Sequence, residues 1–360
     1  MRLRLELILL VIILLINLSF RIYNFRIEYL TKFDPVYWQN RYLQSQWVDP
    51  QSKNSIGDDG LYAYAGWAYI TGHDPTTLNA EMPPLGKYII GLSILIFHNQ
   101  NIYALTIGLL CLLFFYKLNF LILKNKLWSL IPVVVFSFEP LFYQQLRAPY
   151  LDTLYLLLLM LTFFSFLKKK FFLTGLFIGL MALTKNSAST FLLLGLTLVG
   201  YLFITEREQI IKFILNLPVA IIIFILGYSR YFILGHNLRE FLGVQKWILN
   251  FYSIGAKGSL GMVMPMFFNH WQTWWNGVIK ISEWQITWPV TLVFSILYIV
   301  FSIFRHKFDA SLLIVIWLII FISFLSFIPV WPRYFLLILP FTYLLTINLV
   351  KETVSNIISR

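Results

Sequence analysis

Long apolar runs separated by short polar turns dominate the pattern of this 360-residue chain. A helix needs about 20 apolar residues to cross a bilayer. Runs near that length predict helical spans at residues 5–22, 102–123, 128–145, 152–167, 171–185, 189–205, 210–229, 286–304, 310–329 and 333–350. The pattern is typical of an all-α polytopic membrane protein, with about ten transmembrane helices in a single domain, 1–360.

The first apolar run follows a basic start, "MRLRLELILLVIILLINLSF". A signal peptide begins in the same way, but no small-x-small cleavage site follows this run. We therefore expect a retained first helix.

A further apolar run, "LGKYIIGLSILIFH" at 85–98, is ambiguous because it can be counted as another crossing. If it lies in the interface and the N-terminus is cytoplasmic, every basic cluster faces the cytoplasm, as the positive-inside rule requires. The clusters are Arg2 and Arg4, Lys124 and Lys126, Lys168 to Lys170, Arg207 and Lys212, Arg305 and Lys307, and Lys351 and Arg360. We therefore expect a juxtamembrane helix at 85–98 and two long external loops, 23–101 and 230–285.

Composition agrees with a membrane protein and argues against several classes of function. The chain is 59% hydrophobic, 18% aromatic and 12% charged, with a mean hydropathy of +0.75, outside the range of soluble domains. The net charge of +12 comes from short clusters between apolar runs, so we expect no nucleic-acid partner. The one cysteine, Cys111, excludes a disulfide framework and a thiolate metal site.

The remaining ionisable residues gather on the predicted external side. Charged groups at membrane depth are costly, so each is a functional candidate. They are Asp58, Asp59, Asp74, Glu81 and Lys87 in the first loop, Arg147 and Asp152 in the next external turn, Lys185 in the turn after it, Arg230 at the start of the second loop, and Arg333 before the last helix. Together they predict one external cavity of mixed charge.

Ordinary structural roles compete with this interpretation. The acidic residues suit helix N-termini, and a cation at a helix end usually snorkels to the interface. Glu139, followed by Pro140, is a carboxylate near the outer end of a span and needs a partner, for which Arg147 is a candidate. The five histidines show no metal-ligand spacing, so no metal site is predicted: His73, His98, His236, His270 and His306.

The second loop is crowded with aromatic residues, "HWQTWWNGVIKISEWQITWP" at 270–289. Such residues ordinarily form the belt at the membrane interface. The alternative is a flat platform for a sugar or an isoprenoid chain.

Four motifs resemble the protein O-mannosyltransferases and their bacterial relatives, polyprenyl-phosphate-dependent glycosyltransferases of family 39 in the GT-C class. "DDGLYA" is similar to the family's Asp-Glu-aromatic motif, with Asp58 at the position of the essential aspartate and Asp59 in place of glutamate. "MPPLGK" resembles His-Pro-Pro-Leu-Gly-Lys, with Met82 replacing the histidine and Lys87 at its end.

The other two motifs follow in the family's order. "FEPLFYQQLRAPYLD" matches the spacing of Phe-Glu, Gln, Arg and Leu-Asp, which places Glu139, Gln145, Arg147 and Asp152 in register. "GLFIGLMALTKNSAS" resembles a Gly-Leu-rich helix ending at Lys185. The resemblance covers roughly residues 50 to 190; beyond them, "VQKWILNFY" and "WQTWWNG" match only loosely.

The resemblance implies transfer of a sugar, expected to be mannose, from a polyprenyl phosphate to an acceptor hydroxyl at the outer face, with inversion. Asp58 is expected to be the base, supported by Asp59, and Glu139, Gln145 and Asp152 to be supporting residues. The cations available to hold the departing phosphate are Lys87, Arg147, Lys185, Arg230 and Arg333, and the sequence does not rank them. No cofactor is predicted, and a divalent metal is left open.

Two alternatives remain. A transporter or flippase of lipid-linked sugars would need charged residues along a path open alternately to both sides. The acceptor is protein, lipid or glycan, because the motifs concern the donor and the base. The expected location is the cell membrane, with the active site on its external face.

Overall fold

The computed structural model describes residues 2–254, 261–272, 277–304 and 309–358. The protein is mainly helical, as its apolar pattern predicts. Within the described part of the chain, the strands are a single antiparallel pair, β1 (Trp271–Gln272) and β2 (Val278–Ile279).

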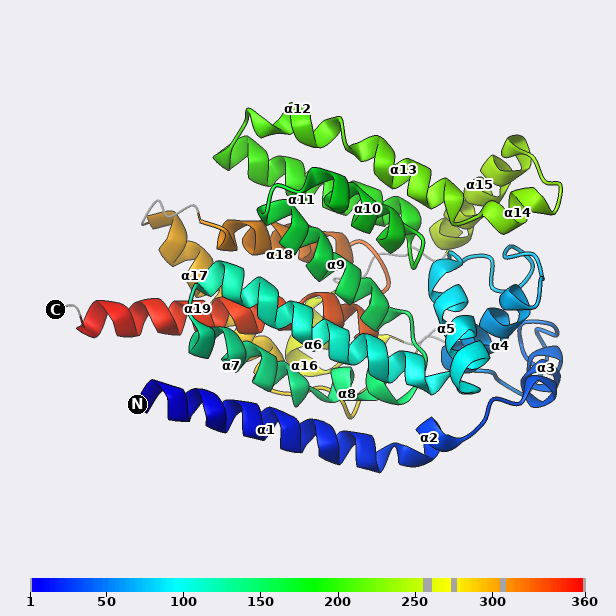
Figure 1. The fold of residues 1–360 in the computed structure, drawn as a ribbon, viewed down its shortest axis with the longest axis horizontal. Helices are drawn as coiled ribbons and strands as arrows, with labels where there is room; N and C mark the ends of the chain where they lie inside the picture. Colours follow the sequence, from blue (N-terminus) through cyan, green and yellow to red (C-terminus); the bar gives the residue numbers. More distant parts are fainter. Residues whose placement is uncertain (1, 255–260, 273–276, 305–308, 359–360) are drawn as a thin grey trace.

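Most helices run along one axis and form an elongated bundle (Figure 1). Both chain termini lie at one end of the bundle, which we call the terminus end; the opposite end is the loop end. The bundle contains α1 (Arg2–Asn24), α6 (Asn101–Leu123), α7 (Lys126–Ser137), α8 (Pro140–Arg147), α9 (Asp152–Leu167), α10 (Phe171–Ala182), α11 (Ser187–Thr205), α12 (Gln209–Ile214), α13 (Leu217–Leu226), α17 (Thr287–Phe304), α18 (Ser311–Leu325) and α19 (Leu339–Ile358).

A second group of helices builds the loop end, where the polar side chains discussed below lie. They are α2 (Arg26–Leu30), α3 (Pro35–Leu43), α4 (Asp58–Ile70), α5 (Leu85–Phe97), α14 (Ser229–Ile233) and α15 (Leu238–Ile254). Two more short elements complete the fold: α16 (Val263–Phe268) and the 3-10 helix η1 (Pro332–Leu337), which leads into α19.

Six described helical segments are long and apolar enough to cross a membrane. The expected span at 128–145 is not one straight helix: α7 and α8 meet at an angle of 67°. The break falls at Glu139, whose extended backbone precedes Pro140, because proline disfavours a helical residue before it. The expected spans at 152–167, 171–185 and 310–329 are shorter apolar helices, α9, α10 and α18.

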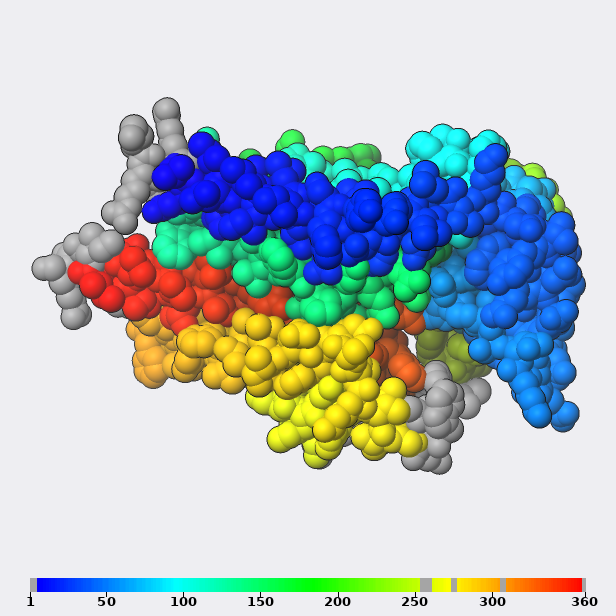
Figure 2. Space-filling view, turned by 90° about the horizontal axis from the view of Figure 1, so that it is seen from below, coloured from blue at the N-terminus to red at the C-terminus, as the bar shows by residue number. Residues whose placement is uncertain are grey.

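Helix α1 lies along the outside of the bundle, as Figure 2 shows from below. Its apolar side chains point mostly outward, as suits a lipid-facing helix. Polar contacts join it to α7: the Asn17 side-chain amide donates to the Ser137 carbonyl at 2.8 Å and to the Ser137 hydroxyl at 3.1 Å.

Helix α5, the ambiguous run of the sequence, lies at the loop end against α4 (Figure 1). The two helices approach closely at glycines: a Cβ on Gly66 would lie 2.5 Å from the Lys87 carbonyl oxygen. The outer side of α5 keeps Leu95, Ile96 and Phe97 exposed. This position and this apolar face suit a helix that lies in the membrane interface.

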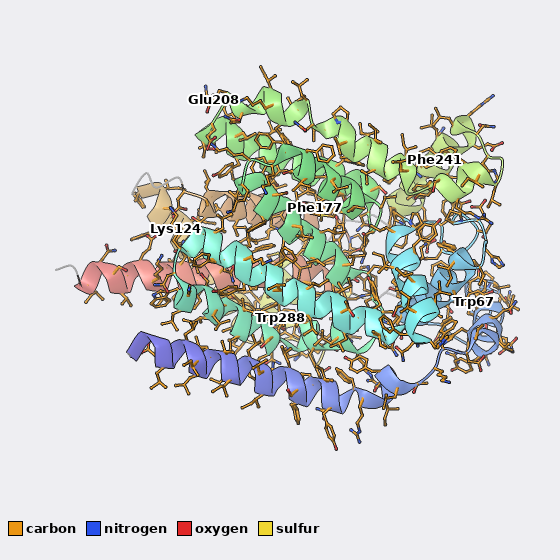
Figure 3. All side chains as sticks on the ribbon, in the orientation of Figure 1. Trp67, Lys124, Phe177, Glu208, Phe241 and Trp288 are labelled. Carbon is orange, nitrogen blue, oxygen red and sulfur yellow. The ribbon has the colours of Figure 1, made fainter. Side chains whose placement is uncertain are left out.

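The turns α6–α7, α9–α10 and α11–α12 lie at the terminus end, where Figure 3 labels Lys124 and Glu208. Lys169 pairs there with Glu206 at 2.6 Å, and Lys351 donates to the Leu123 carbonyl at 2.6 Å. Arg305, Lys307 and Arg360 of the basic clusters lie outside the described residues. The described basic turns therefore share one end of the bundle.

The side of the membrane on which each end lies can be tested with engineered cysteines, because the native Cys111 is buried. We expect a membrane-impermeant maleimide to label Lys53→Cys, at the loop end, in intact cells. The same reagent should label Lys168→Cys, at the terminus end, only after permeabilisation. Labelling of both in intact cells would mean that α5 crosses the membrane, and the reverse pattern would invert the topology.

Candidate active site

Four charged side chains from distant segments meet at the loop end and form what we call the charge cluster: Asp58, Asp152, Lys185 and Arg333. Arg333 Nη2 donates to Asp58 Oδ2, and Arg333 Nη1 lies 3.6 Å from Asp152 Oδ2. Lys185 Nζ donates to Asp152 Oδ1 at 2.6 Å. Carboxylates and cations therefore alternate along one connected network.

Burial differs sharply across the charge cluster. The side chains of Asp152 and Lys185 are each 6% exposed, whereas those of Asp58 and Arg333 are 36% and 25% exposed. The cluster therefore has a buried pair on its inner side and a more accessible pair on its outer side.

Helix starts position both carboxylates, but neither side chain caps its own helix. Asp58 is the first residue of α4 and Asp152 the first of α9, and their described side-chain hydrogen bonds come from Arg333 and Lys185. A carboxylate in a first turn is favoured by the helix dipole. The side chains are thus free to bind cations, in place of the capping roles that their sequence positions suggest.

Two tyrosine rings flank the cations of the cluster. The Arg333 guanidinium lies 4.9 Å from the Tyr150 ring centre, and Lys185 Nζ lies 5.2 Å from that of Tyr334. Burial, followed by the charge of Asp59, raises the pKa of Tyr150 to about 12. Asp59 is therefore a near neighbour of the cluster, although it is not one of its ion-paired members.

Lys87 is fully buried and binds backbone of the first loop. Its ammonium donates to the carbonyl oxygens of Asn79 and Met82, each at 2.7 Å. Burial lowers the pKa of Lys87 to about 7, and the charge of Glu81 opposes that shift. In this structure Lys87 fixes the loop before α5, outside the charge cluster.

Glu139 has partners other than the expected Arg147, so that expectation was wrong. Its buried carboxylate accepts hydrogen bonds from Trp288 Nε1 at 2.9 Å and from the Tyr343 hydroxyl at 2.5 Å. Those residues lie on α17 and α19, so Glu139 ties the α7–α8 break to the C-terminal helices. Nothing in the sequence pattern singled out either aromatic partner.

Gln145 lies on α8 and is 1% exposed. Its side-chain amide has no hydrogen-bond partner among the described residues. Of the three supporting residues Glu139, Gln145 and Asp152, Gln145 is the one whose side chain makes no hydrogen bond within the described part of the chain.

The other two arginines bind elsewhere at the loop end. Arg147 has a side chain that is 61% exposed and pairs with Glu28 at 2.8 Å. Arg230 donates from Nη2 to the Gly72 carbonyl at 2.6 Å. Of the five candidate cations, Lys185 and Arg333 are those that contact cluster carboxylates in the described structure.

A histidine joins the first loop to α15, which sequence analysis did not foresee. His236 lies between Asp74 and Glu240, with nitrogen–oxygen distances of 2.8 and 3.2 Å. Its ring stacks on Tyr231, with centres 4.1 Å apart. Within the described residues, no group of three His, Cys, Asp or Glu side chains is arranged to hold a metal ion.

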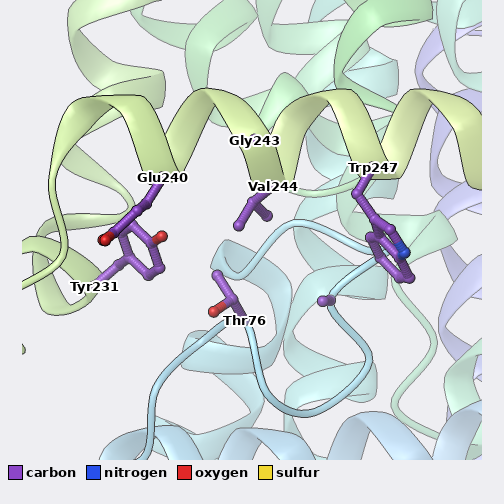
Figure 4. Close-up of a pocket in the computed structure, with 7 residues that line it drawn as sticks. Thr76, Tyr231, Glu240, Gly243, Val244 and Trp247 are labelled. Atoms are coloured by element: carbon purple, nitrogen blue, oxygen red, sulfur yellow. The ribbon is translucent and has the colours of Figure 1, made fainter.

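Beside this contact, a groove of about 450 Å³ runs between α15 and the first loop (Figure 4). Tyr231 and Glu240 lie at one end, Trp247 at the other, and Thr76 faces α15 from the loop. The groove thus combines aromatic surface with hydroxyl and carboxylate groups.

Part of the aromatic second loop is structural. Trp271 is 2% exposed and packs edge-to-face against Trp288 and Phe335. Trp274 and Trp275 lie outside the described residues.

Comparison with known proteins identifies the fold. No protein-family model and no curated protein matches the sequence. The structure is similar to ArnT from Cupriavidus metallidurans bound to undecaprenyl phosphate, with a TM-score of 0.61, 15% identity, and coverage of 82% of this chain and 56% of that one. Against ArnT in the apo state, the TM-score is 0.60 at 16% identity, over 82% and 55% of the two chains.

The chain has a GT-C fold. It matches little more than half the length of the ArnT chains, so the GT-C likeness concerns architecture. The all-α polytopic class predicted from the sequence is confirmed.

We predict that the buried ion pair between Asp152 and Lys185 stabilises the fold. Asp152→Ala leaves the Lys185 ammonium buried without its counter-ion, so we expect a loss of about 3–5 kcal/mol in the free energy of unfolding. Asp59→Ala, which removes an acid outside the ion-paired network, should cost less than about 1 kcal/mol. Thermal unfolding of both variants in detergent measures the difference, and equal midpoints would show that the Asp152–Lys185 pair contributes nothing special.

Proposed function

We propose that the protein is a membrane glycosyltransferase that transfers a sugar from a polyprenyl phosphate to an acceptor hydroxyl. The observation that supports this most is the charge cluster, which brings a partly exposed carboxylate, Asp58, against a cation, Arg333. A displacement at the anomeric carbon needs a base for the acceptor proton and a cation for the departing phosphate. The GT-C fold, seen in an ArnT bound to undecaprenyl phosphate, agrees with such a donor.

In this proposal Asp58 accepts the proton of the acceptor hydroxyl while the acceptor oxygen bonds to the anomeric carbon. The bond from that carbon to the phosphate oxygen breaks, and its electron pair stays with the phosphate. Arg333 stabilises the added negative charge, which an arginine does well through paired N–H donors. Asp152 and Lys185 hold Arg333 in place from the buried side.

The finer parts of the proposal rest on the motif resemblance. The sugar is mannose, the reaction inverts the anomeric centre, and the chemistry occurs at the external face of the cell membrane. Serine or threonine hydroxyls of proteins are the first acceptor class to test, followed by lipids and glycans.

The first test is transfer of label from radiolabelled polyprenyl-phosphate mannose in membranes that contain the protein. Asp58→Asn should lower the rate by about 100- to 10,000-fold, because the amide does not accept the proton. Asp49→Asn, an exposed aspartate of the same loop, should keep wild-type activity. Wild-type activity in Asp58→Asn would overturn the assignment of the base.

Product partitioning in the same assay identifies the acceptor. Label in protein, lipid or glycan fractions names its class. Donor that stays intact with the wild type as well as the variants calls for other sugars, and then supports the flippase, which moves its cargo without chemistry.

The groove beside α15 is the proposed approach of the acceptor. Ala80, in its wall, directly precedes Glu81, and burial raises the pKa of Glu81, with the nearby Asp58 charge adding to the shift. The groove wall and the proposed base thus belong to the same loop, 23–101. An exposed tryptophan, Trp247, supplies the kind of flat surface on which sugar rings and extended chains pack.

Trp247→Ala should raise the KM for the acceptor by about three- to tenfold, since an aromatic contact contributes about 0.5–1.5 kcal/mol. Donor binding should not change. Leu242→Ala is the matched control, because Leu242 is an exposed apolar residue of α15 that does not line the groove. Equal effects of the two substitutions on KM would place the acceptor elsewhere.

A further inference from the structure

The proposed base is already occupied in this structure. Asp58 Oδ2 accepts a hydrogen bond from Arg333 Nη2. The oxygen that would accept the acceptor proton is therefore held by the guanidinium. The same contact occupies part of the guanidinium that the departing phosphate would use. The two groups that the reaction needs therefore bind each other.

The neighbours of Arg333 show which of its contacts can be replaced. Asp152 is buried and held at 2.6 Å by Lys185, so it is a fixed counter-ion. Asp58 has a 36% exposed side chain and binds Arg333 from the accessible side. An anion that arrives from solvent or from the interface therefore competes with Asp58 and leaves Asp152 in place.

Arg333 also has hydrogen-bonding capacity left. Its Nη1 atom is buried and makes no hydrogen bond with the described residues, and its nearest carboxylate oxygen, Asp152 Oδ2, is 3.6 Å away. A buried guanidinium nitrogen without a partner is costly. A phosphate group, with several acceptor oxygens, would satisfy both Nη1 and Nη2 in the paired geometry that arginine favours.

The charges of the cluster balance without a ligand. It holds two carboxylates and two cations, so an incoming phosphate diester has no net positive charge to meet unless one carboxylate moves away. Displacement of Asp58 exposes one positive charge, which matches the single negative charge of a diester. Cleavage of the sugar–phosphate bond then adds charge to the phosphate while Arg333 is already bound to it.

We propose that the donor phosphate replaces Asp58 on Arg333, so that donor binding itself frees the base. This inference rests on the proposed function and adds an order to it: Asp58 becomes able to accept the acceptor proton only after the phosphate occupies Arg333. No bond is made or broken in the exchange, and the transfer step keeps the balance described above. The exchange also predicts that Asp58 opposes donor binding.

The test is the affinity of the purified protein for farnesyl phosphate, a short polyprenyl phosphate monoester, measured by isothermal titration calorimetry. Asp58→Asn removes the competing charge and should lower the Kd by about three- to fivefold, the upper part of the range expected of a partly exposed ion pair. Asp59→Asn removes the same charge from the next residue of α4, outside the ion-paired network, and should change the Kd by less than about twofold. Arg333→Lys should weaken binding in both the wild-type and the Asp58→Asn background.

The possible outcomes test two proposals separately: the exchange of Asp58 for phosphate on Arg333, and the glycosyltransferase function. Wild-type binding, with tighter binding only in Asp58→Asn, supports the exchange. Wild-type binding with an equal or weaker affinity in Asp58→Asn overturns the exchange and leaves the glycosyltransferase in place. Equal tightening in Asp58→Asn and Asp59→Asn also overturns it, because bulk charge would then explain the effect. Absence of binding in every folded variant counts against the polyprenyl-phosphate donor itself. Asp58→Ser, measured in the same way, replaces Asp58→Asn if that variant does not fold.

Discussion

The buried ion pair between Asp152 and Lys185 is the constraint on which the loop end depends. Each charge costs several kcal/mol to remove from water, and the cost is offset only when both partners are in place with good geometry. The pair joins the start of α9 to the segment after α10, and through Arg333 it reaches η1, which leads into α19. The positions of three bundle segments are thereby coupled to the charge of one carboxylate.

The Asp152–Lys185 pair explains how Arg333 can be held in position and still bind a phosphate. Arg333 lies between a buried carboxylate, Asp152, and a partly exposed one, Asp58. In the proposed exchange Asp152 keeps Arg333 in position while phosphate takes the place of Asp58. Had Asp58 been as buried as Asp152, an exchange would strand a charge in a low-dielectric environment. The difference in burial makes the exchange with a phosphate feasible.

The sequence pattern predicted the positions of the helices and the candidate charged residues. It did not predict which side chains pair with each other. Apolar runs predict bundle helices because lipid demands them, and rare charges among those runs mark candidate sites. Hydropathy does not register a local backbone break, so the α7–α8 bend at Pro140 was missed. Nor does it register burial: Lys87, expected as a phosphate cation, binds backbone carbonyls, and Arg147, expected beside Glu139, pairs with Glu28.

Arg333 shows most clearly why the rest could not be predicted. Its partner Asp58 is 275 positions away in the chain, so no local pattern distinguishes it from Arg147 or Arg230. The distinction comes from the tertiary fold, which gives Arg230 a carbonyl and Arg333 a carboxylate as its neighbour. Of these two neighbours, only the carboxylate can act as a proton acceptor at neutral pH, so only Arg333 lies against a group that fits the proposed base. Of the three arginines, Arg333 is therefore the one on which we propose that an anionic substrate and the base compete.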